Sequence, residues 1–470
     1  MSSFKMPLTI QTYQSRDKSV SSQRLLNMYV EQMPADSKTS AVLFNTEGCK
    51  PYINITNSPI YGLHYMYPNL YSISGIDVYK LDEDGTVTNI GNIGATNGIV
   101  RSADNGSQIL TVKPNGEGYI TTDSAVTKIE DENFPVASDV AFIAQYFVVS
   151  QMNSGRFYWS KLLDGTVWSA LGFATQESNP DNLVGLAEYR GDLWLFGDKT
   201  TEIWQVTGDP DLPFQRVGSG VLNIGCKAKR TIQKDKNSLY WLGNDLQVHM
   251  AQGYGEQRIS THDMEREFEE VFTNENMTNA YSFTYSKNGH DFYVITVPNS
   301  KTYVFDTTTK VWHEKKTSDI ETWLPSCIAS AFSMDIVGDS ATGRLYTLDT
   351  NYFKDRDNDY IEREIIFPTV FQNYERIIYD TLYADIETGM TRIIQGQGSN
   401  PQVMLCWSDD GGITFKSERW RSFGKIGSYK KIVEWRQLGQ SKQRIFKIRM
   451  TEPVKFSLSS LYVEGAQCYA

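Results

Sequence analysis

The chain has 470 residues, of which 40% are hydrophobic, 21% charged and 13% aromatic. This composition indicates a folded protein of two or three domains and excludes a disordered chain. The formal net charge of −11 disfavours long-range attraction to DNA. No segment reaches the roughly 18 consecutive apolar residues of a membrane span, and the N-terminus lacks the apolar segment of a secretory signal. We therefore expect no membrane span and synthesis in a cytoplasm.

Motifs for catalysis or for binding a metal or cofactor are not found. The five cysteines and five histidines are scattered, and no pair has metal-ligand spacing. A phosphate-binding glycine loop, a nucleophile elbow and a zinc-protease motif are also missing from the sequence. We expect free buried thiols, no catalytic residue, no metal and no cofactor.

Residues 1–57 show little periodicity and contain the chain-breaking residues Pro34, Gly48 and Pro51. They predict an extended N-terminal arm with a short strand or two. Such arms usually become ordered against a neighbouring part of a structure.

An aromatic or β-branched residue recurs in short strands over residues 58–355. The seven positions are Tyr79, Tyr119, Tyr158, Trp204, Val248, Tyr303 and Tyr346. The steps between them are 40, 39, 46, 44, 55 and 43 residues. A period near 40 to 45 residues with about four short strands per unit is typical of a β-propeller. The pattern predicts a propeller of about seven blades.

The single long step is explained by a predicted helix over residues 262–273. Met264, Phe268, Val271 and Phe272 share one helical face, and acidic residues crowd the N-terminal half. Ser260 or Thr261 could cap this helix. Removing 12 residues from the step of 55 leaves 43, which matches the period.

The repeat ends near Asp355, and residues 356–470 contain longer runs in which apolar and polar residues alternate. Such runs predict a separate C-terminal antiparallel β-sandwich. The expected fold is therefore all-β, with an N-terminal arm, a propeller over 58–355 and a sandwich over 356–470.

Two motifs in the C-terminal third resemble functional loops. Residues 408–415 fit the Ser-x-Asp-x-Gly-x-Thr-aromatic pattern of an Asp-box, which predicts a hairpin turn held by Asp–backbone hydrogen bonds. Residues 355–362 resemble the start of a calcium loop, but Tyr360 replaces the required glycine. A solvated linker is the preferred interpretation of this second segment.

Residues 416–455 contain 12 basic and 3 acidic residues, interleaved with aromatic side chains. Such a surface could bind nucleic acid by phosphate contact and stacking, or the acidic face of a protein or of another copy of this chain. It could also be a solvated sheet face. Protein contact is favoured over DNA because the chain is acidic overall. The candidate partner-binding residues are Arg419, Trp420, Arg421, Lys425, Lys430 and Lys431.

Several segments resemble the packaged-DNA stabilisation protein, or tail accessory (hub) factor, of short-tailed bacteriophages. The segments that carry this resemblance are 177–185, Gly197, 201–208, 27–29, 48–51, 433–439, 446–449 and 453–454. They occur in the family's order from the arm to the C-terminus.

The resemblance implies a non-enzymatic structural protein of the virion tail. Six copies would form a ring below the portal and its adaptor ring, close the DNA channel, seat the needle or plug and help to attach the tail spikes. Genomic DNA would be met at most in the channel lumen. The alternatives are a carbohydrate-binding propeller that acts as an adhesin or receptor-binding protein, and a sialidase-like glycoside hydrolase.

Overall fold

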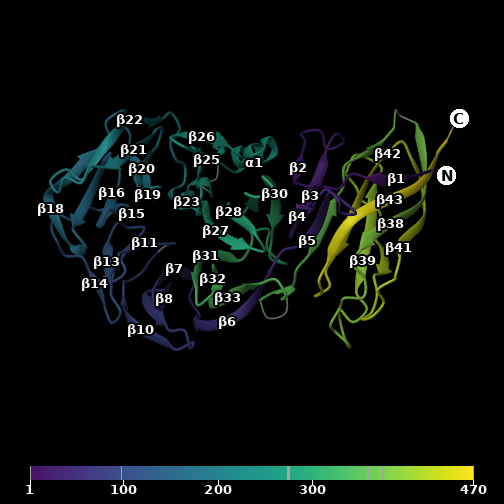
Figure 1. Ribbon diagram of the computed structural model, residues 1–470, viewed down its shortest axis with the longest axis horizontal. Helices are drawn as coiled ribbons and strands as arrows, with labels where there is room; N and C mark the ends of the chain where they lie inside the picture. Colours follow the sequence, from purple (N-terminus) through teal and green to yellow (C-terminus); the bar gives the residue numbers. More distant parts are fainter. Residues whose placement is uncertain (1, 97, 273–275, 357–358, 373–374, 469–470) are drawn as a thin grey trace.

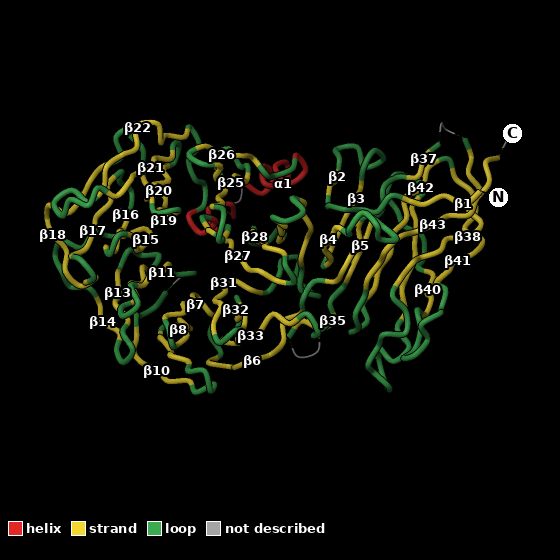
Figure 2. Tube along the Cα trace, in the orientation of Figure 1, coloured by secondary structure: helices red, strands yellow, loops and turns green. Residues whose placement is uncertain are grey.

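The computed structural model describes residues 2–96, 98–272, 276–356, 359–372 and 375–468. It consists of a ring of short sheets beside a two-layered β-sandwich, and both termini lie at the sandwich (Figure 1). Strands and loops make up nearly the whole trace, and helix is confined to short segments near the ring (Figure 2). The chain is therefore all-β, a propeller followed by a sandwich.

The ring contains seven antiparallel four-stranded units. The first three are β7 (Ile60–Met66), β8 (Asn69–Ser74), β9 (Asp77–Leu81) and β10 (Val87–Asn92); β11 (Arg101–Asp104), β12 (Ile109–Val112), β13 (Gly118–Thr121) and β14 (Val126–Lys128); and β15 (Ala137–Ile143), β16 (Tyr146–Gln151), β17 (Arg156–Lys161) and β18 (Asp164–Thr175). The fourth and fifth are β19 (Leu183–Tyr189), β20 (Asp192–Gly197), β21 (Thr201–Val206) and β22 (Phe214–Leu222); and β23 (Gln233–Lys234), β24 (Leu239–Leu242), β25 (Val248–Gln252) and β26 (Gly255–Arg258). The sixth is β27 (Tyr281–Lys287), β28 (His290–Thr296), β29 (Thr302–Asp306) and β30 (Val311–Lys315), and the seventh is β31 (Pro325–Ala331), β32 (Met334–Asp339), β33 (Gly343–Asp349) and β6 (Gly48–Thr56).

Each of the seven recurring sequence positions lies in the third strand of one unit. Tyr79 is in β9, for example, Trp204 in β21 and Tyr346 in β33. The third strand pairs with both the second and the fourth, and side chains at these positions pack against the neighbouring unit, as Trp204 packs edge-on against Phe157 of the third unit. Trp204 and Tyr346 are accordingly buried. The periodicity therefore reports packing between units rather than a binding site.

The seventh unit is closed by a strand from the other end of the chain. β6 pairs antiparallel with β33, from Gly48 opposite Asp349 to Thr56 opposite Gly343. Its first residue is closely fitted, because a Cβ on Gly48 would lie 2.2 Å from the carbonyl oxygen of Tyr352. The backbone N–H of the next residue, Cys49, donates to the buried Asp355 carboxylate at 3.3 Å.

The long step in the repeat contains helix α1 (His262–Phe272). Met264 and Phe268 are buried under it, and Val271 packs beside them, as the predicted helical face requires. The side chain of Phe272 lies outside the described residues. Glu267 accepts hydrogen bonds from Lys301 and Tyr303 of the sixth unit, at 2.8 and 2.7 Å. The short 3-10 helices η1 (Lys229–Thr231) and η2 (Asn276–Asn279) flank the fifth unit.

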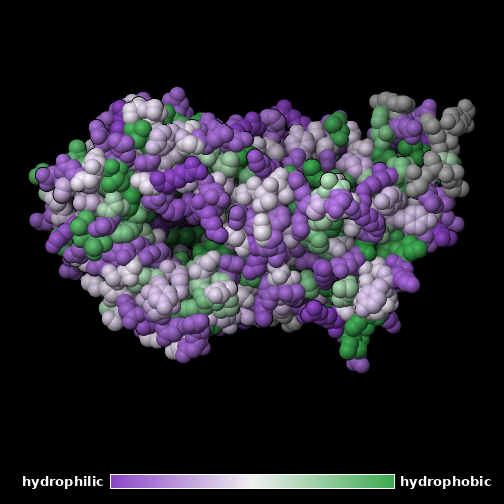
Figure 3. Space-filling model, in the orientation of Figure 1, coloured by the Kyte–Doolittle hydropathy of each residue, from purple (hydrophilic) through white to green (hydrophobic). Residues whose placement is uncertain are grey.

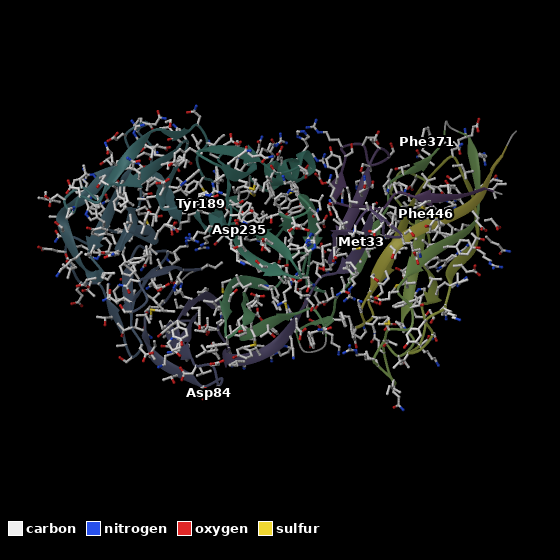
Figure 4. The ribbon with its side chains drawn as sticks, in the orientation of Figure 1. Met33, Asp84, Tyr189, Asp235, Phe371 and Phe446 are labelled. Atoms are coloured by element: carbon white, nitrogen blue, oxygen red, sulfur yellow. The ribbon has the colours of Figure 1, made fainter. Side chains whose placement is uncertain are left out.

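The sandwich encloses one continuous core between two sheets. The first sheet has the order β4 (Met28–Gln32), β5 (Ala41–Asn45), β43 (Ser457–Cys468), β38 (Arg376–Ile386) and β41 (Val433–Ser441), and β1 (Ser2–Met6) also pairs with β43. The second runs β3 (Ser22–Leu26), β36 (Arg363–Ile366), β42 (Gln443–Met450), β39 (Gln402–Ser408) and β40 (Arg419–Ser422), with β2 (Tyr13–Gln14) on β3 and β37 (Val370–Phe371) on β42. Phe446 of β42 lies among the sandwich strands, whereas Asp84 lies at the outer edge of the propeller (Figure 4).

The second sandwich sheet is continuous with the sixth propeller unit. Strand β3 pairs in parallel with β30 through Leu26 and Glu314, and antiparallel with β36. Arg24 of β3 bridges the two sides, because its guanidinium lies 2.8 Å from Glu314 and 3.2 Å from Glu364. Hydrogen-bonded strands and buried charges thus join the two domains.

Residues 1–57 differ from the extended arm expected from the sequence, because they contain six strands. Five of these strands belong to the two sandwich sheets and β6 belongs to the propeller. The segment is ordered against its own chain. The expected linker after Asp355 also differs, because β34 (Lys354–Asp355) pairs with β35 (Asp359–Tyr360) and Asp355 is buried.

Candidate functional site

The predicted basic surface divides into two parts with different roles. Arg419, Trp420 and Arg421 lie in β40, the last strand of the second sandwich sheet. Arg419 donates to the carbonyl oxygens of Arg436 and Gln437, at 3.0 and 3.2 Å. Arg421 donates to the carbonyl oxygen of Glu434 at 3.0 Å. Both arginines therefore join β40 to β41 of the facing sheet.

Trp420 is 51% exposed between these two arginines. Side chains alternate along a strand, so the residues on either side of Trp420 face β41 while the indole ring faces away from it. The indole is a large apolar surface beside charged groups, which is a common composition at protein interfaces. Of the three candidates in β40, Trp420 is the one whose side chain does not bond to β41, whereas Arg421 is exposed but held by the Glu434 carbonyl.

The three predicted lysines project from the next loop, residues 423–432. Lys425, Lys430 and Lys431 are all exposed, and none of them pairs with a carboxylate of the described residues. The same loop exposes Ile426 by 56%, Tyr429 by 66% and Ile432 by 69%. Because it combines exposed apolar side chains with unpaired lysines, this loop is the part of the predicted surface best suited to bind a partner.

A second loop, residues 387–398, lies against the lysine loop and is missed by the sequence prediction. The N–H of Gly427 donates to the carbonyl of Gly389 at 3.1 Å, and the Thr388 hydroxyl donates to the carbonyl of Tyr429 at 3.0 Å. This second loop exposes Met390 by 47% and Ile394 by 79%, together with Arg392. We call loops 387–398 and 423–432 together the loop pair.

The loop pair has a common chemical character that sequence composition could have indicated. Apart from Glu387, which pairs with Lys455 at 2.7 Å, the loop pair contains no aspartate or glutamate, although the chain has 56 acidic residues. Apolar surface gathers on the loops that project from the lower edge of the sandwich (Figure 3). A protruding surface that is both apolar and cationic fits a protein partner with an acidic face.

A groove of about 530 Å³ runs from the loop pair to the junction of the two domains. Met390 and Arg392 line it on one side, and Tyr29 and Asn288 line it on the other. Because the groove is open to the loop pair, a partner bound there would contact both domains.

The Asp-box segment forms a turn rather than a ligand site. Asp410 accepts hydrogen bonds from the N–H groups of Ile413 and Thr414 at 3.0 and 2.9 Å, and both of its glycines have positive φ. The neighbouring Asp409 holds the guanidinium of the fully buried Arg444 at 2.7 Å. These bonds fix the end of β39 against β42.

Three of the five histidines are paired with aspartates. His64 lies 2.7 Å from Asp104, His290 lies 2.7 Å from Asp306, and His249 lies 3.1 Å from Asp245. In the calcium-loop-like segment Asp355 is buried against Cys49, and Asp357 lies outside the described residues. Among the described residues no three His, Cys, Asp or Glu side chains are grouped as metal ligands, and no helix is long and apolar enough to cross a membrane.

Comparison with known families gives two matches that run in order along the chain. The family model described as "Bacteriophage P22 Gp10, beta-propeller" matches residues 5–353, and the one described as "Bacteriophage P22 Gp10, beta-sandwich" matches residues 362–466. No curated protein is significantly similar in sequence.

Solved structures resemble the chain at 10% identity each. The computationally designed protein Ika8 has a TM-score of 0.41 and aligns over 64% of this chain and 99% of its own. The WD40 domain of Neurospora crassa Pan2 has a TM-score of 0.43 over 67% and 97%. PorZ, a surface component of the type-IX secretion system of Porphyromonas gingivalis, has a TM-score of 0.38 over 65% and 37%.

Proposed function

Since the chain belongs to the bacteriophage P22 Gp10 family and is a structural protein of a phage tail, we propose that it forms the hub ring of that tail. In this proposal six copies assemble below the portal and its adaptor ring in the virion. The ring closes the DNA channel after packaging, seats the needle or plug, and anchors the tail spikes. Its action is mechanical and requires no chemical step.

The observation that carries the proposal is the joining of the two domains by a shared sheet. A ring that closes a channel over packaged DNA must resist force without bending between its domains. Domains connected by a linker alone usually move relative to each other. Here β3 hydrogen-bonds to both domains, and Arg24 pairs with Glu314 of the propeller and Glu364 of the sandwich. Such a subunit suits a load-transmitting ring.

The distribution of charge supports contacts between this chain and acidic partners. Residues 1–355 hold 29 basic and 42 acidic residues, whereas residues 416–455 hold 12 and 3. The cationic loop pair could therefore dock on the propeller of the next copy or on an acidic face of the adaptor ring. Opposite potentials of this kind guide association and determine orientation.

Reconstitution of the tail from purified components tests the proposal. The chain is mixed with rings of portal and adaptor protein, and the product is analysed by native mass spectrometry and electron microscopy. We expect six copies per portal ring, and subsequent binding of needle and spike proteins only to the complete ring. Absence of binding to the portal–adaptor rings would contradict the proposal.

The same preparations distinguish the two alternatives. A receptor-binding adhesin would bind glycans as an isolated chain, and a sialidase-like hydrolase would release sugar from glycoside substrates. If the chain forms the hub ring, it should show neither glycan binding nor glycoside hydrolysis. Glycan arrays and a fluorogenic glycoside assay on the isolated chain check both activities.

A further inference from the structure

A cavity of about 290 Å³ lies at the centre of the propeller, where the surface is visibly hollowed (Figure 3). The first strands of four units, β7, β11, β27 and β31, line most of it. Its charged lining residues are Arg101 and Arg230, with His64 beside them, and no aspartate or glutamate lines it among the described residues. This is an unusual composition in a chain with 56 acidic and 45 basic residues.

Arg230 lines this cavity without a compensating negative charge among the described residues. It belongs to the short helix η1, and its guanidinium forms no ion pair or hydrogen bond within the described part of the chain. Burial and the neighbouring Arg101 lower the pKa of Arg230. A charged group removed from water without a partner is unfavourable for the folded state.

The two carboxylates that pair with lining residues of the cavity are already engaged, since Asp104 lies 2.7 Å from His64 and Asp139 pairs with Arg101. Asp139 is buried and accepts hydrogen bonds from the Arg101 Nε at 2.8 Å and from the N–H groups of Val140 and Leu186 at 2.9 and 3.1 Å. Lys229 adds a further cation beside it, with its ammonium 2.8 Å from the carbonyl oxygen of Ser138. Arg101 and Lys229 therefore share the Asp139 carboxylate, which leaves Arg230 without one among the described residues.

We propose that this central cavity is a binding site for a compact, multivalent oxyanion of the phosphate class, held between Arg101 and Arg230. Guanidinium groups bind phosphate oxygens through paired, charge-assisted hydrogen bonds. Arg101 uses only its Nε for Asp139 among the described contacts, which leaves both terminal nitrogens for the anion. The site does not depend on the proposed function and lies in the opposite domain from the loop pair.

The other polar lining groups explain why the arginines determine the ligand. The hydroxyl of Ser282 donates to the carbonyl of Thr231, that of Thr284 to Lys234, and that of Ser326 to Ile60. These hydroxyls can accept but have no second proton to donate. An anion needs donors, and the guanidinium groups supply them. The cavity volume admits phosphate, pyrophosphate or one phosphoryl head group but no nucleic-acid duplex.

Thermal unfolding of the full chain in different anions at constant ionic strength tests this site. We expect phosphate and pyrophosphate to raise the melting temperature by roughly 2 to 4 °C relative to chloride, and calorimetric titration to give one site per chain. Titration with adenosine monophosphate distinguishes free phosphate from a phosphoryl group on a larger ligand. An equal melting temperature in phosphate and chloride would overturn the proposal.

Two variants and one control assign the effect to the cavity. Arg230→Gln is expected to weaken phosphate binding at least about 10-fold, because one guanidinium is lost. Arg230→Met is expected to fold at least as well as the native chain in chloride, since it removes a half-buried charge that has no ion-pair partner among the described residues, and to lose the same binding. The control Lys199→Gln removes an exposed positive charge from the fourth unit and should bind normally. Retention of native affinity in either Arg230 variant would refute the assignment.

Discussion

Two histidines in the sixth propeller unit, on strands β28 and β30, have pKa values shifted in opposite directions. Burial, with a contribution from Lys315, lowers the pKa of His313 to about 3. Hydrogen bonding to Asp306 raises the pKa of His290. His313 is thus neutral in the folded chain at every pH at which the chain is handled, whereas His290 is readily protonated. The two residues make opposite contributions to the pH dependence of stability.

The substitution His313→Gln should reduce the loss of stability in acid. An unfolded histidine with a pKa near 6.5 takes up a proton at pH 5, but the buried imidazole does not. The free energy of unfolding therefore falls through His313 by about 2 kcal/mol between pH 8 and pH 5. Urea titrations at pH 8 and at pH 5 measure this change in the free energy of unfolding. We expect the variant to show a smaller drop than the native chain, and an unchanged drop would contradict the assignment.

His290→Asn serves as the opposite case. Because the folded pKa of His290 is raised, its stabilising contribution is fully present below about 6.5, the ordinary histidine value, and is lost as the pH rises through the folded pKa. The variant should therefore lose more stability at pH 6 than at pH 9. The same urea titrations report this difference, and equal losses at the two pH values would exclude the ion pair with Asp306 as its source.

A buried ion pair between Glu47 and Lys315 fastens the N-terminal segment to the propeller. Both side chains are almost completely buried, and the Tyr285 hydroxyl also donates to Glu47 at 2.7 Å. Although burial favours the neutral acid, Lys315 keeps the pKa of Glu47 below its ordinary value. The Lys315 ammonium lies 3.5 Å from the centre of the Trp323 ring.

Lys315→Met should destabilise the chain by about 3 to 5 kcal/mol, because it leaves the Glu47 carboxylate buried without a counter-charge. The double variant Glu47→Gln with Lys315→Met removes both charges, so it should recover most of that loss. Urea unfolding at pH 7.5 measures the three chains. A double variant as unstable as the single one would show that the loss is due to packing rather than to the unpaired charge.

At the scale of the strands, local patterns were predictable and long-range pairings were not. The recurring positions such as Tyr79 and Tyr303 are recognisable because the alternating apolar residues and the turn residues lie within a few positions of each other. Strand β6 pairs with β33 nearly 300 residues later. The local sequence of an edge strand does not indicate which distant strand it will pair with. Residues 1–57 therefore look irregular in sequence, although their strands pair with distant parts of the chain.

The dependence on long-range contacts also explains why only part of the basic surface could be predicted from the sequence. Composition alone identified residues 416–455 but could not separate Arg419 and Arg421, which bond to backbone carbonyls of β41, from the free lysines of the next loop. Loop 387–398 was missed because its contact with Gly427 and Tyr429 depends on the folding of the sandwich.

Gly48→Val should detach the strand that closes the propeller. A Cβ at this position would lie 2.2 and 2.5 Å from the carbonyl oxygens of Tyr352 and Lys354, so β6 must shift away from its site. We expect a loss of about 3 kcal/mol or more, at the upper end of overpacking effects, and faster proteolysis of residues 1–57. Denaturant unfolding and limited proteolysis measure both effects.

Gly218→Val is the matched control for this substitution. A Cβ on Gly218, in β22, meets nothing within 4 Å, so the same added side chain should cost little there. If the two variants unfolded alike, the close fit of Gly48 would not be what holds β6 in place.

At the scale of the whole molecule, rigidity and charge are distributed in complementary ways. The continuous sheet through β30, β3 and β36 keeps the propeller and the sandwich in one orientation. The loop pair is therefore presented at a fixed distance from the acidic propeller. In a ring of copies with one repeated contact, each loop pair would face the same surface of its neighbour. Assembly should consequently depend on salt, because the contact combines exposed charges with apolar side chains.

Reversing the three free lysines tests this arrangement without disturbing the sandwich. Lys425, Lys430 and Lys431 form no ion pair within the described residues, so changing all three to glutamate should leave the melting temperature nearly unchanged. Binding to tail assembly intermediates at low salt should weaken by about 10-fold to 100-fold, because attraction becomes repulsion. The control chain carries the same charge change at the exposed lysines Lys161, Lys199 and Lys236 of the propeller. If the loop variant assembled like the native chain, or if the control were equally impaired, the loop pair would not be the contact.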